Sequence, residues 1–127
     1  MTIAFWCVLA AALSTMIWTG VAKLGGSGFP ASGNHNPREV LESLDGYRKR
    51  ANWAQLNSYE AFPPFAAAVI IAHIAHANQV WVDNLAIAFV AFRLAYGVCY
   101  IKDWAALRSA VWGCGLACVI ALFVISA

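Results

Sequence analysis

Four long apolar stretches take up most of this 127-residue chain. A transmembrane helix needs about 20 mainly apolar residues, and stretches of at least that length run over residues 3–22, 47–77, 81–101 and 105–125. The chain is 62% hydrophobic and only 11% charged, which leaves too few polar side chains to cover a soluble domain of this size. We therefore expect an all-α membrane protein in which residues 1–127 form one domain, a bundle of four transmembrane helices.

The connection between the first two stretches, residues 23–46, is the only long one. Its Gly, Ser, Pro and Asn residues indicate irregular backbone. Every basic residue except Arg93 lies in or beside this first loop or the third loop, residues 102–104. These residues are Lys23, Arg38, Arg48, Lys49, Arg50, Lys102 and Arg108. The positive-inside rule predicts that the first and third loops face the cytosol. The net charge of only +2 gives no reason to expect a nucleic-acid partner.

Two residues of opposite charge, Glu60 and Arg93, lie well inside the predicted spans. An ionisable side chain that faces lipid costs ~2.5 to 3.5 kcal/mol, so such residues usually face the interior of a bundle. Glu60 follows Arg50 by ten residues, or roughly 15 Å of helix, and Arg93 precedes Ile101 by eight, or roughly 12 Å. Both distances are measured from the predicted cytosolic end, so the two residues lie at a similar depth in the membrane. Because they carry opposite charges, the two side chains should face each other, directly or through a ligand.

Helical spacing extends this pair into a candidate polar pocket. Asn57 lies three residues before Glu60, and Arg93, Tyr96 and Tyr100 share one face of the third stretch. Arg108 enters from the start of the fourth stretch. Guanidinium groups match carboxylates and a carboxylate can hold an ammonium group, so the pocket suits a small zwitterion with anionic groups. The alternative is that these polar groups only satisfy one another and fix the register of the helices.

Three other features have a simple interpretation. Pro63 and Pro64 follow Glu60 and should bend the second helix, opening a cavity above the carboxylate. His73 and His76 lie three residues apart, but two ligands alone make a weak metal site, so we expect no metal. Most tryptophans lie near predicted span ends and suit an interfacial aromatic belt, although Trp112 could instead face the polar pocket; they include Trp6, Trp18, Trp81 and Trp104.

Two segments of this chain resemble signatures of a known membrane family. The run "RANWAQLNSYEAFPPF" is similar to the second-helix signature of the MAPEG family, the membrane-associated proteins of eicosanoid and glutathione metabolism. The run "FRLAYGVCYIKDWAALRS" is similar to that family's third-helix face and the Arg-Ser pair that begins its fourth helix. The resemblance implies a homotrimer in the lipid bilayer, with glutathione bound between neighbouring subunits near the cytosolic side. "NPRE" and "AFPPFAAAVIIA" look most like the bacterial branch, which implies the bacterial inner membrane.

The resemblance also implies roles for single residues. Those that match the family's glutathione-binding positions are Gln55, Asn57, Glu60, Arg93, Tyr96 and Tyr100. Arg108 matches the arginine credited with stabilising the glutathione thiolate, and Ser109 lies beside it. Where well-studied members carry a further arginine, this chain has Trp53 or Leu56, so Arg50, one turn earlier, is the candidate substitute.

The implied function is a glutathione transferase or peroxidase of the microsomal type. It would activate the glutathione thiol toward a lipophilic electrophile or a lipid hydroperoxide. Two other classes stay open. One is a binding or scaffold protein of the same fold with a degenerate site, which the missing arginine favours. The other is a small proton-coupled exporter, although the first apolar stretch has no ionisable residue of the kind that such exporters carry there.

Overall fold

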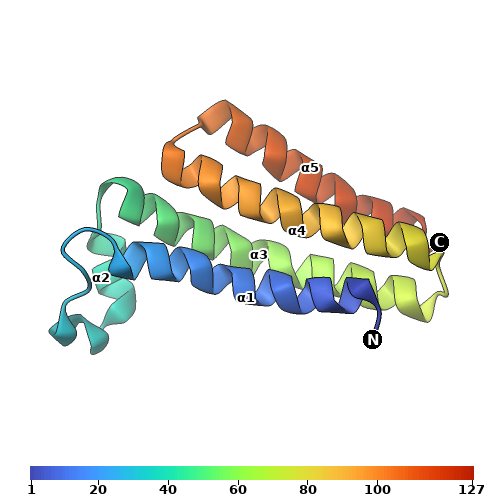
Figure 1. The fold of residues 1–127 in the computed structure, drawn as a ribbon, viewed down its shortest axis with the longest axis horizontal. Helices are drawn as coiled ribbons and strands as arrows, with labels where there is room; N and C mark the ends of the chain where they lie inside the picture. Colours follow the sequence, from blue (N-terminus) through green and yellow to red (C-terminus); the bar gives the residue numbers. More distant parts are fainter.

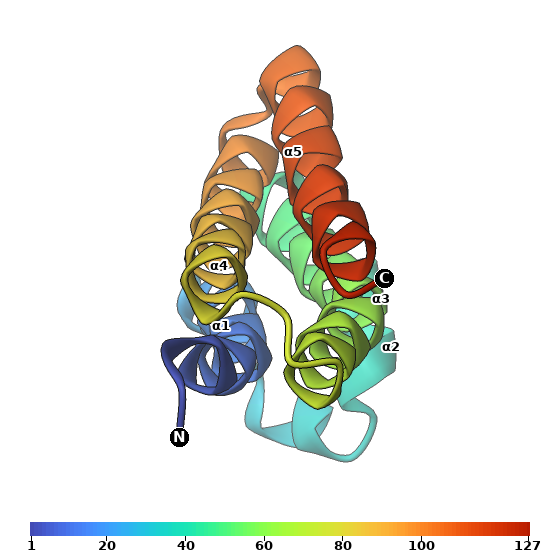
Figure 2. The same cartoon turned by 90° about the vertical axis from the view of Figure 1, so that its right-hand side faces the viewer.

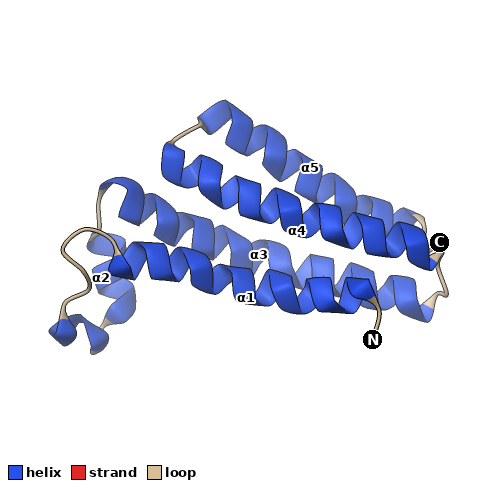
Figure 3. Cartoon of the chain, in the orientation of Figure 1, coloured by secondary structure: helices blue, strands red, loops and turns tan.

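The computed structural model describes all 127 residues as helices and short connections, with no strand (Figure 3). The elements in chain order are α1 (Ile3–Leu24), the 3-10 turn η1 (Ala31–Asn34), α2 (Pro37–Ser43), α3 (Gly46–Ile74), α4 (Gln79–Lys102) and α5 (Ala105–Val124). The bounds of the four long helices differ from the predicted stretches by at most three residues. The largest difference is at the end of α3, which stops at Ile74 rather than at residue 77.

The four long helices run roughly along one direction, with α1 against α3 and α4 lying across both (Figure 1). Helix α5 packs mainly on α4, and the end view shows it above α3 (Figure 2). Toward the α4–α5 turn, α5 diverges from α3, so the two helices are closest near the C-terminus (Figure 1). The long loop with η1 and α2 lies at the same end of the molecule as the α4–α5 turn.

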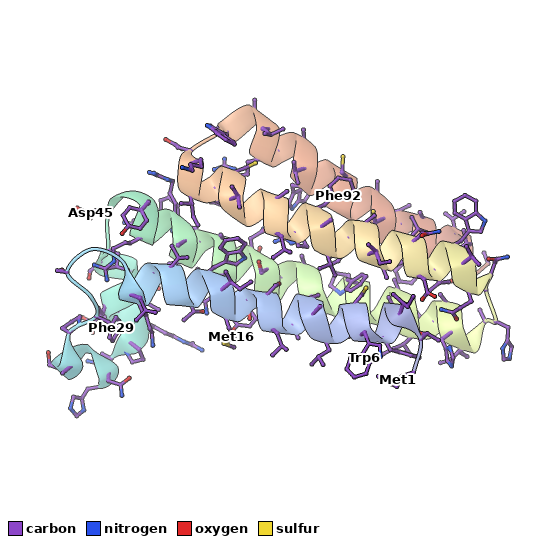
Figure 4. All side chains as sticks on the ribbon, viewed as in Figure 1. Met1, Trp6, Met16, Phe29, Asp45 and Phe92 are labelled. Atoms are coloured by element: carbon purple, nitrogen blue, oxygen red, sulfur yellow. The ribbon has the colours of Figure 1, made fainter.

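Three of these helices, α1, α4 and α5, are long and apolar enough to cross a membrane. Large apolar side chains cover their outer surfaces. Trp6 and Met16 are examples on α1, where both point away from the other helices (Figure 4) and are more than half exposed. Helix α3 does not meet the same criterion: its first half holds three basic residues, and polar residues and two prolines lower the mean hydropathy of its second half. The crossing predicted for α3 therefore stays a prediction.

Small residues let the helices approach closely, as is common for helix packing in membranes. Ala4, Ala68, Ala72 and Ala86 are fully buried in the main core, which spans all four long helices. Within that core the Phe65 ring stacks on the Phe89 ring of α4, with the two centroids 3.9 Å apart. This packing places α4 firmly on α3 about one and a half turns from Glu60.

Trp18 of α1 packs closely against Gly97 of α4. A Cβ atom built on Gly97 would overlap the indole ring, so only glycine leaves room for it. Trp18 is only 5% exposed. Its expected place in an interfacial belt is therefore wrong, because the indole fills the notch that Gly97 leaves between two helices.

The loop end is tied together by Arg48. Its Nε donates to the Ala22 carbonyl oxygen at 2.8 Å, and its Nη2 donates to the Gly28 carbonyl oxygen at 2.9 Å. The last carbonyl groups of a helix have no intrahelical donor, so this guanidinium satisfies the end of α1 and holds the loop on α3.

We expect Gly97→Ala to lower the free energy of unfolding by about 1 to 3 kcal/mol, because overpacking forces side chains or backbone to shift. Thermal unfolding in detergent measures the effect. Gly113→Ala on α5 is the matched control, since a Cβ there meets nothing within 4 Å, and it should be neutral or stabilising. Equal melting temperatures for the two variants would show that Trp18 has another position.

Candidate functional site

Arg93 is the central buried charge of the molecule. It lies on α4 with only 5% of its surface exposed, and its Nη2 donates to Asn57 Oδ1 at 2.9 Å and to Ser58 Oγ at 3.4 Å, both on α3. Its Nε is buried without a hydrogen-bond partner. Gly115 of α5 lies beside Arg93, since a Cβ at that position would be in ordinary contact with the Arg93 Cδ atom at 3.9 Å.

Glu60 is joined to Arg93 through Asn57 rather than by direct contact. The Asn57 side chain accepts from Arg93 with its Oδ1 and donates from its Nδ2 to Glu60 Oε2 at 3.2 Å. We expected the two charges to meet directly or through a ligand; in the structure the Asn57 amide of the protein itself lies between them. Glu60 itself is exposed, so its carboxylate is free to bind a further group.

A ladder of cations and aromatic rings continues from Arg93 along α4. The Arg93 guanidinium lies 4.5 Å from the Tyr96 ring centroid, Tyr96 meets Tyr100 edge-on at 5.5 Å, and the Arg108 guanidinium of α5 lies 4.4 Å from the Tyr100 ring. Such stacks stabilise a cation without neutralising it. Both arginines of the ladder therefore keep their charge available beside the same pair of phenols.

Two cavities share Asn57 and Glu60. The first, which we call the α3–α4 cavity, has a volume of about 370 Å³ and is otherwise lined by Trp53, Leu56 and Tyr100. The second, the α3–α5 cleft, has a volume of about 200 Å³ and is otherwise lined by Ala61, Pro64, Trp112, Leu116 and Val119. The suggestion that Trp112 faces the polar residues thus agrees with its place in the cleft.

Gln55 lies apart from these cavities. It lines a third cavity of about 420 Å³, the α2–α3 cavity, with residues of α2 and α3; the others are Arg38, Leu41, Glu42, Asn52, Leu56 and Tyr59. Gln55 precedes Glu60 by five residues, which is about 140° around a helix of 3.6 residues per turn. The Gln55 Oε1 atom is buried without a partner. One chain therefore does not bring Gln55 and Glu60 around a common ligand.

Two other predicted residues have local hydrogen bonds. Arg50 donates through Nε and Nη2 to the Ile101 carbonyl oxygen, at 3.3 and 3.0 Å, and so caps the end of α4. Ser109 is exposed, and its Oγ donates to the Ala105 carbonyl oxygen at 3.2 Å within its own helix. Neither lines the cavities that hold Glu60, so a ligand-binding role for Arg50 and a catalytic role for Ser109 stay predictions.

Sequence reasoning missed Ser58, which contacts the Arg93 guanidinium. Ser58 Oγ also donates to the Ala54 carbonyl oxygen at 2.8 Å, so its free lone pairs point toward the arginine. A usable signal was present, because Ala51, Ala54, Ser58 and Phe65 recur at helical spacing and mark the interior face of α3. A polar residue on that face predicts a polar partner on another helix.

Asn57→Ala should lower the free energy of unfolding by roughly 2 kcal/mol, because it removes the best partner of a buried cation. Glu60→Gln keeps an acceptor for Asn57 at an exposed position and should cost under about 0.5 kcal/mol. Thermal unfolding of both variants in one detergent compares them directly. A larger loss for Glu60→Gln would mean that the carboxylate, and not the amide, holds Arg93.

A comparison with known protein families identifies the family of this chain. The family model described as "MAPEG family" matches residues 3–127. Comparisons with curated proteins and with solved structures found no significant match. The matched region covers essentially the whole chain and contains every polar residue described above. The protein therefore belongs to the MAPEG family, a family of integral membrane proteins associated with glutathione and eicosanoid metabolism.

Proposed function

We propose that this protein binds glutathione and activates its thiol toward a lipophilic electrophile or a lipid hydroperoxide. The observation that carries the proposal is the Arg93–Asn57–Glu60 chain beside the ladder that ends at Arg108. Membership of a glutathione-associated family supports the choice of ligand. The exposed Glu60 carboxylate suits the ammonium group of the tripeptide, and the guanidinium groups suit its carboxylates.

In this proposal Arg108 favours the thiolate. A free thiol has a pKa near 8.5, so it is mostly protonated at neutral pH, and a nearby cation shifts the balance toward the nucleophilic thiolate. The Arg108 guanidinium lies at the end of the ladder on the face of Tyr100. Tyr100 also lines the α3–α4 cavity, so only the Tyr100 ring links the Arg108 guanidinium to that cavity.

We further propose that the binding site is completed by a neighbouring copy of the chain. Two predicted ligand residues, Gln55 and Glu60, lie on different sides of α3, with the exposed Leu56 lining the cavities on both sides. The unpartnered Gln55 Oε1 needs a donor that its own chain does not supply. A second copy that packs its Gln55 side against the Glu60 side of the first would bring both residues to one ligand.

The exposed residues of α3 support a trimer built around this helix. One row of them recurs at alternating spacings of three and four, with Tyr59, Pro64, Ile71 and His73 exposed beside it: Trp53, Leu56, Glu60, Pro63, Ala67, Ile70 and Ile74. This 3.5-residue repeat is the pattern of helices that pack against copies of themselves. Such packing would also shield the polar face of α3 from lipid. We therefore propose a four-span homotrimer with the α2 loop and the α4–α5 turn on the cytosolic side.

One observation favours the scaffold alternative. The family resemblance places Trp53 or Leu56 where well-studied members carry an arginine. The Trp53 ring centroid lies 6.2 Å from that of Tyr100 and 5.6 Å from Lys49 Nζ. An aromatic ring therefore lines this part of the α3–α4 cavity in place of an anion clamp. Glutathione affinity decides between the two functions, because a scaffold needs no ligand at this position.

Calorimetric titration of the detergent-purified protein should give saturable binding of glutathione and of a thiol-less analogue. Arg108→Ala should reduce the ultraviolet thiolate absorbance of bound glutathione by about tenfold, equivalent to one pKa unit. The control Arg108→Lys retains a cation and should keep part of the signal. Unchanged absorbance in Arg108→Ala would remove the role of this residue, and no heat from either ligand would favour the scaffold.

Mixed oligomers test whether the site joins two chains. Gln55→Leu and Glu60→Gln should each weaken glutathione binding when expressed alone. When the two variants are co-expressed in equal amounts, about one in four head-to-tail interfaces carries both native residues and should regain binding. Calorimetric stoichiometry measures this recovery. If the mixture binds no better than the separate variants, both residues serve one chain.

A further inference from the structure

Lys49 is a cation of α3 that has no acceptor of its own. The two arginines beside it are occupied, because Arg48 donates to carbonyl oxygens of α1 and of the first loop and Arg50 donates to the Ile101 carbonyl oxygen. The Lys49 ammonium group makes no hydrogen bond within the chain and lies 5.6 Å from the centroid of the Trp53 ring. Its charge is therefore free to bind a ligand.

The Trp53 ring holds this charge beside the α3–α4 cavity. Trp53 lines that cavity together with Glu60 and Tyr100. A cation within about 6 Å of the centroid of an indole ring is attracted to its face and keeps its charge. A lysine side chain that is already ordered on a ring loses less conformational entropy when it binds an anion than a free side chain does. Trp53 thus supports the ammonium group, and Lys49 meets the ligand.

Lys49 and Glu60 place opposite charges at the two ends of one face of α3. Lys49, Trp53, Leu56 and Glu60 follow one another at spacings of four, three and four residues, so they share that face. Trp53 precedes Glu60 by seven residues, or roughly 10 Å of helix. An extended peptide of three residues spans at most about 11 Å. A ligand of tripeptide length with its ammonium group at Glu60 therefore brings its other end to Trp53, where the Lys49 ammonium group lies.

We propose that Lys49, held over the Trp53 ring, binds the glycine carboxylate of glutathione. The inference rests on the proposed glutathione function and assigns the two ends of the ligand, the ammonium group to Glu60 and the glycine carboxylate to Lys49. The thiol belongs to the middle residue of the tripeptide and then lies beside Tyr100, whose ring is 4.4 Å from the Arg108 guanidinium. The neighbouring copy proposed above would cover this face of α3 and enclose the ligand.

Two ligands that differ in one charge test the assignment. Glutathione and its glycine monoethyl ester share the ammonium group, the thiol and the γ-glutamyl carboxylate, but only glutathione carries the glycine carboxylate. Calorimetric titration of the wild-type protein in detergent should give about tenfold higher affinity for glutathione than for the ester, because the ester cannot form the charge-assisted hydrogen bond. In Lys49→Met, which keeps most of the alkyl stem on the ring, the two affinities should agree within about twofold.

Lys49→Arg and Lys23→Met are the matched controls. Lys49→Arg retains a cation and should keep most of the preference for glutathione over the ester. Lys23 also lies at the predicted cytosolic end with its ammonium group over an aromatic ring, 4.8 Å from the Phe29 centroid, but it lines none of the cavities around α3. Lys23→Met therefore removes the same charge from the same end of the molecule and should leave the preference unchanged. Gel filtration checks that the three variants keep the wild-type assembly.

The outcomes separate this inference from the function on which it rests. If glutathione binds but Lys49→Met keeps the wild-type preference over the ester, another cation holds the glycine carboxylate and the inference is overturned, while the proposed function stands. Equal affinities of the wild-type protein for the two ligands, or an equal loss of preference in Lys23→Met, would overturn it as well. A wild-type protein that binds neither ligand would overturn the proposed function and this inference with it.

Discussion

The buried guanidinium of Arg93 is the constraint around which the polar half of this protein is arranged. A charge inside a bundle of apolar helices must find partners there, since lipid offers none. Asn57 and Ser58 supply them from α3, and Tyr96 covers the cation from its own helix. Glu60 is held in turn by Asn57. One buried cation thus orients the amide, the exposed carboxylate and the register of α3 against α4.

Most of the helical architecture could be predicted from the sequence, and for a simple reason. Long apolar runs separated by short polar links leave few alternatives to a bundle of helices. Helical spacing also brought Asn57, Glu60, Arg93 and the tyrosines to one side of the molecule. Helical spacing could not reveal that Asn57 lies between Glu60 and Arg93. The depth of two residues in the bundle does not show whether their side chains are long enough to touch.

The features that sequence reasoning did not reveal depend on contacts between distant parts of the chain. Trp18 fits an interfacial belt by its position, yet the glycine that accommodates it lies on another helix. Gln55 was grouped with Glu60 because a family motif contains both, although helix geometry places them well apart around α3. The binding role of Arg50 stays a prediction, but the sequence did not reveal that its guanidinium donates to the Ile101 carbonyl oxygen at the end of α4. Each of these outcomes follows from packing between helices, which no local pattern records.

The link between Arg93 and Asn57 also bears on how the chain is made. The two residues are 36 positions apart, on consecutive long helices joined by residues 75–78. During synthesis, α3 would reach the membrane before its partner exists, with an amide and a carboxylate that lipid cannot satisfy. Once α4 has left the ribosome, the amide and the guanidinium can hide each other. We therefore expect α3 and α4 to be inserted together as a helical hairpin that the hydrogen bond between Arg93 and Asn57 holds together.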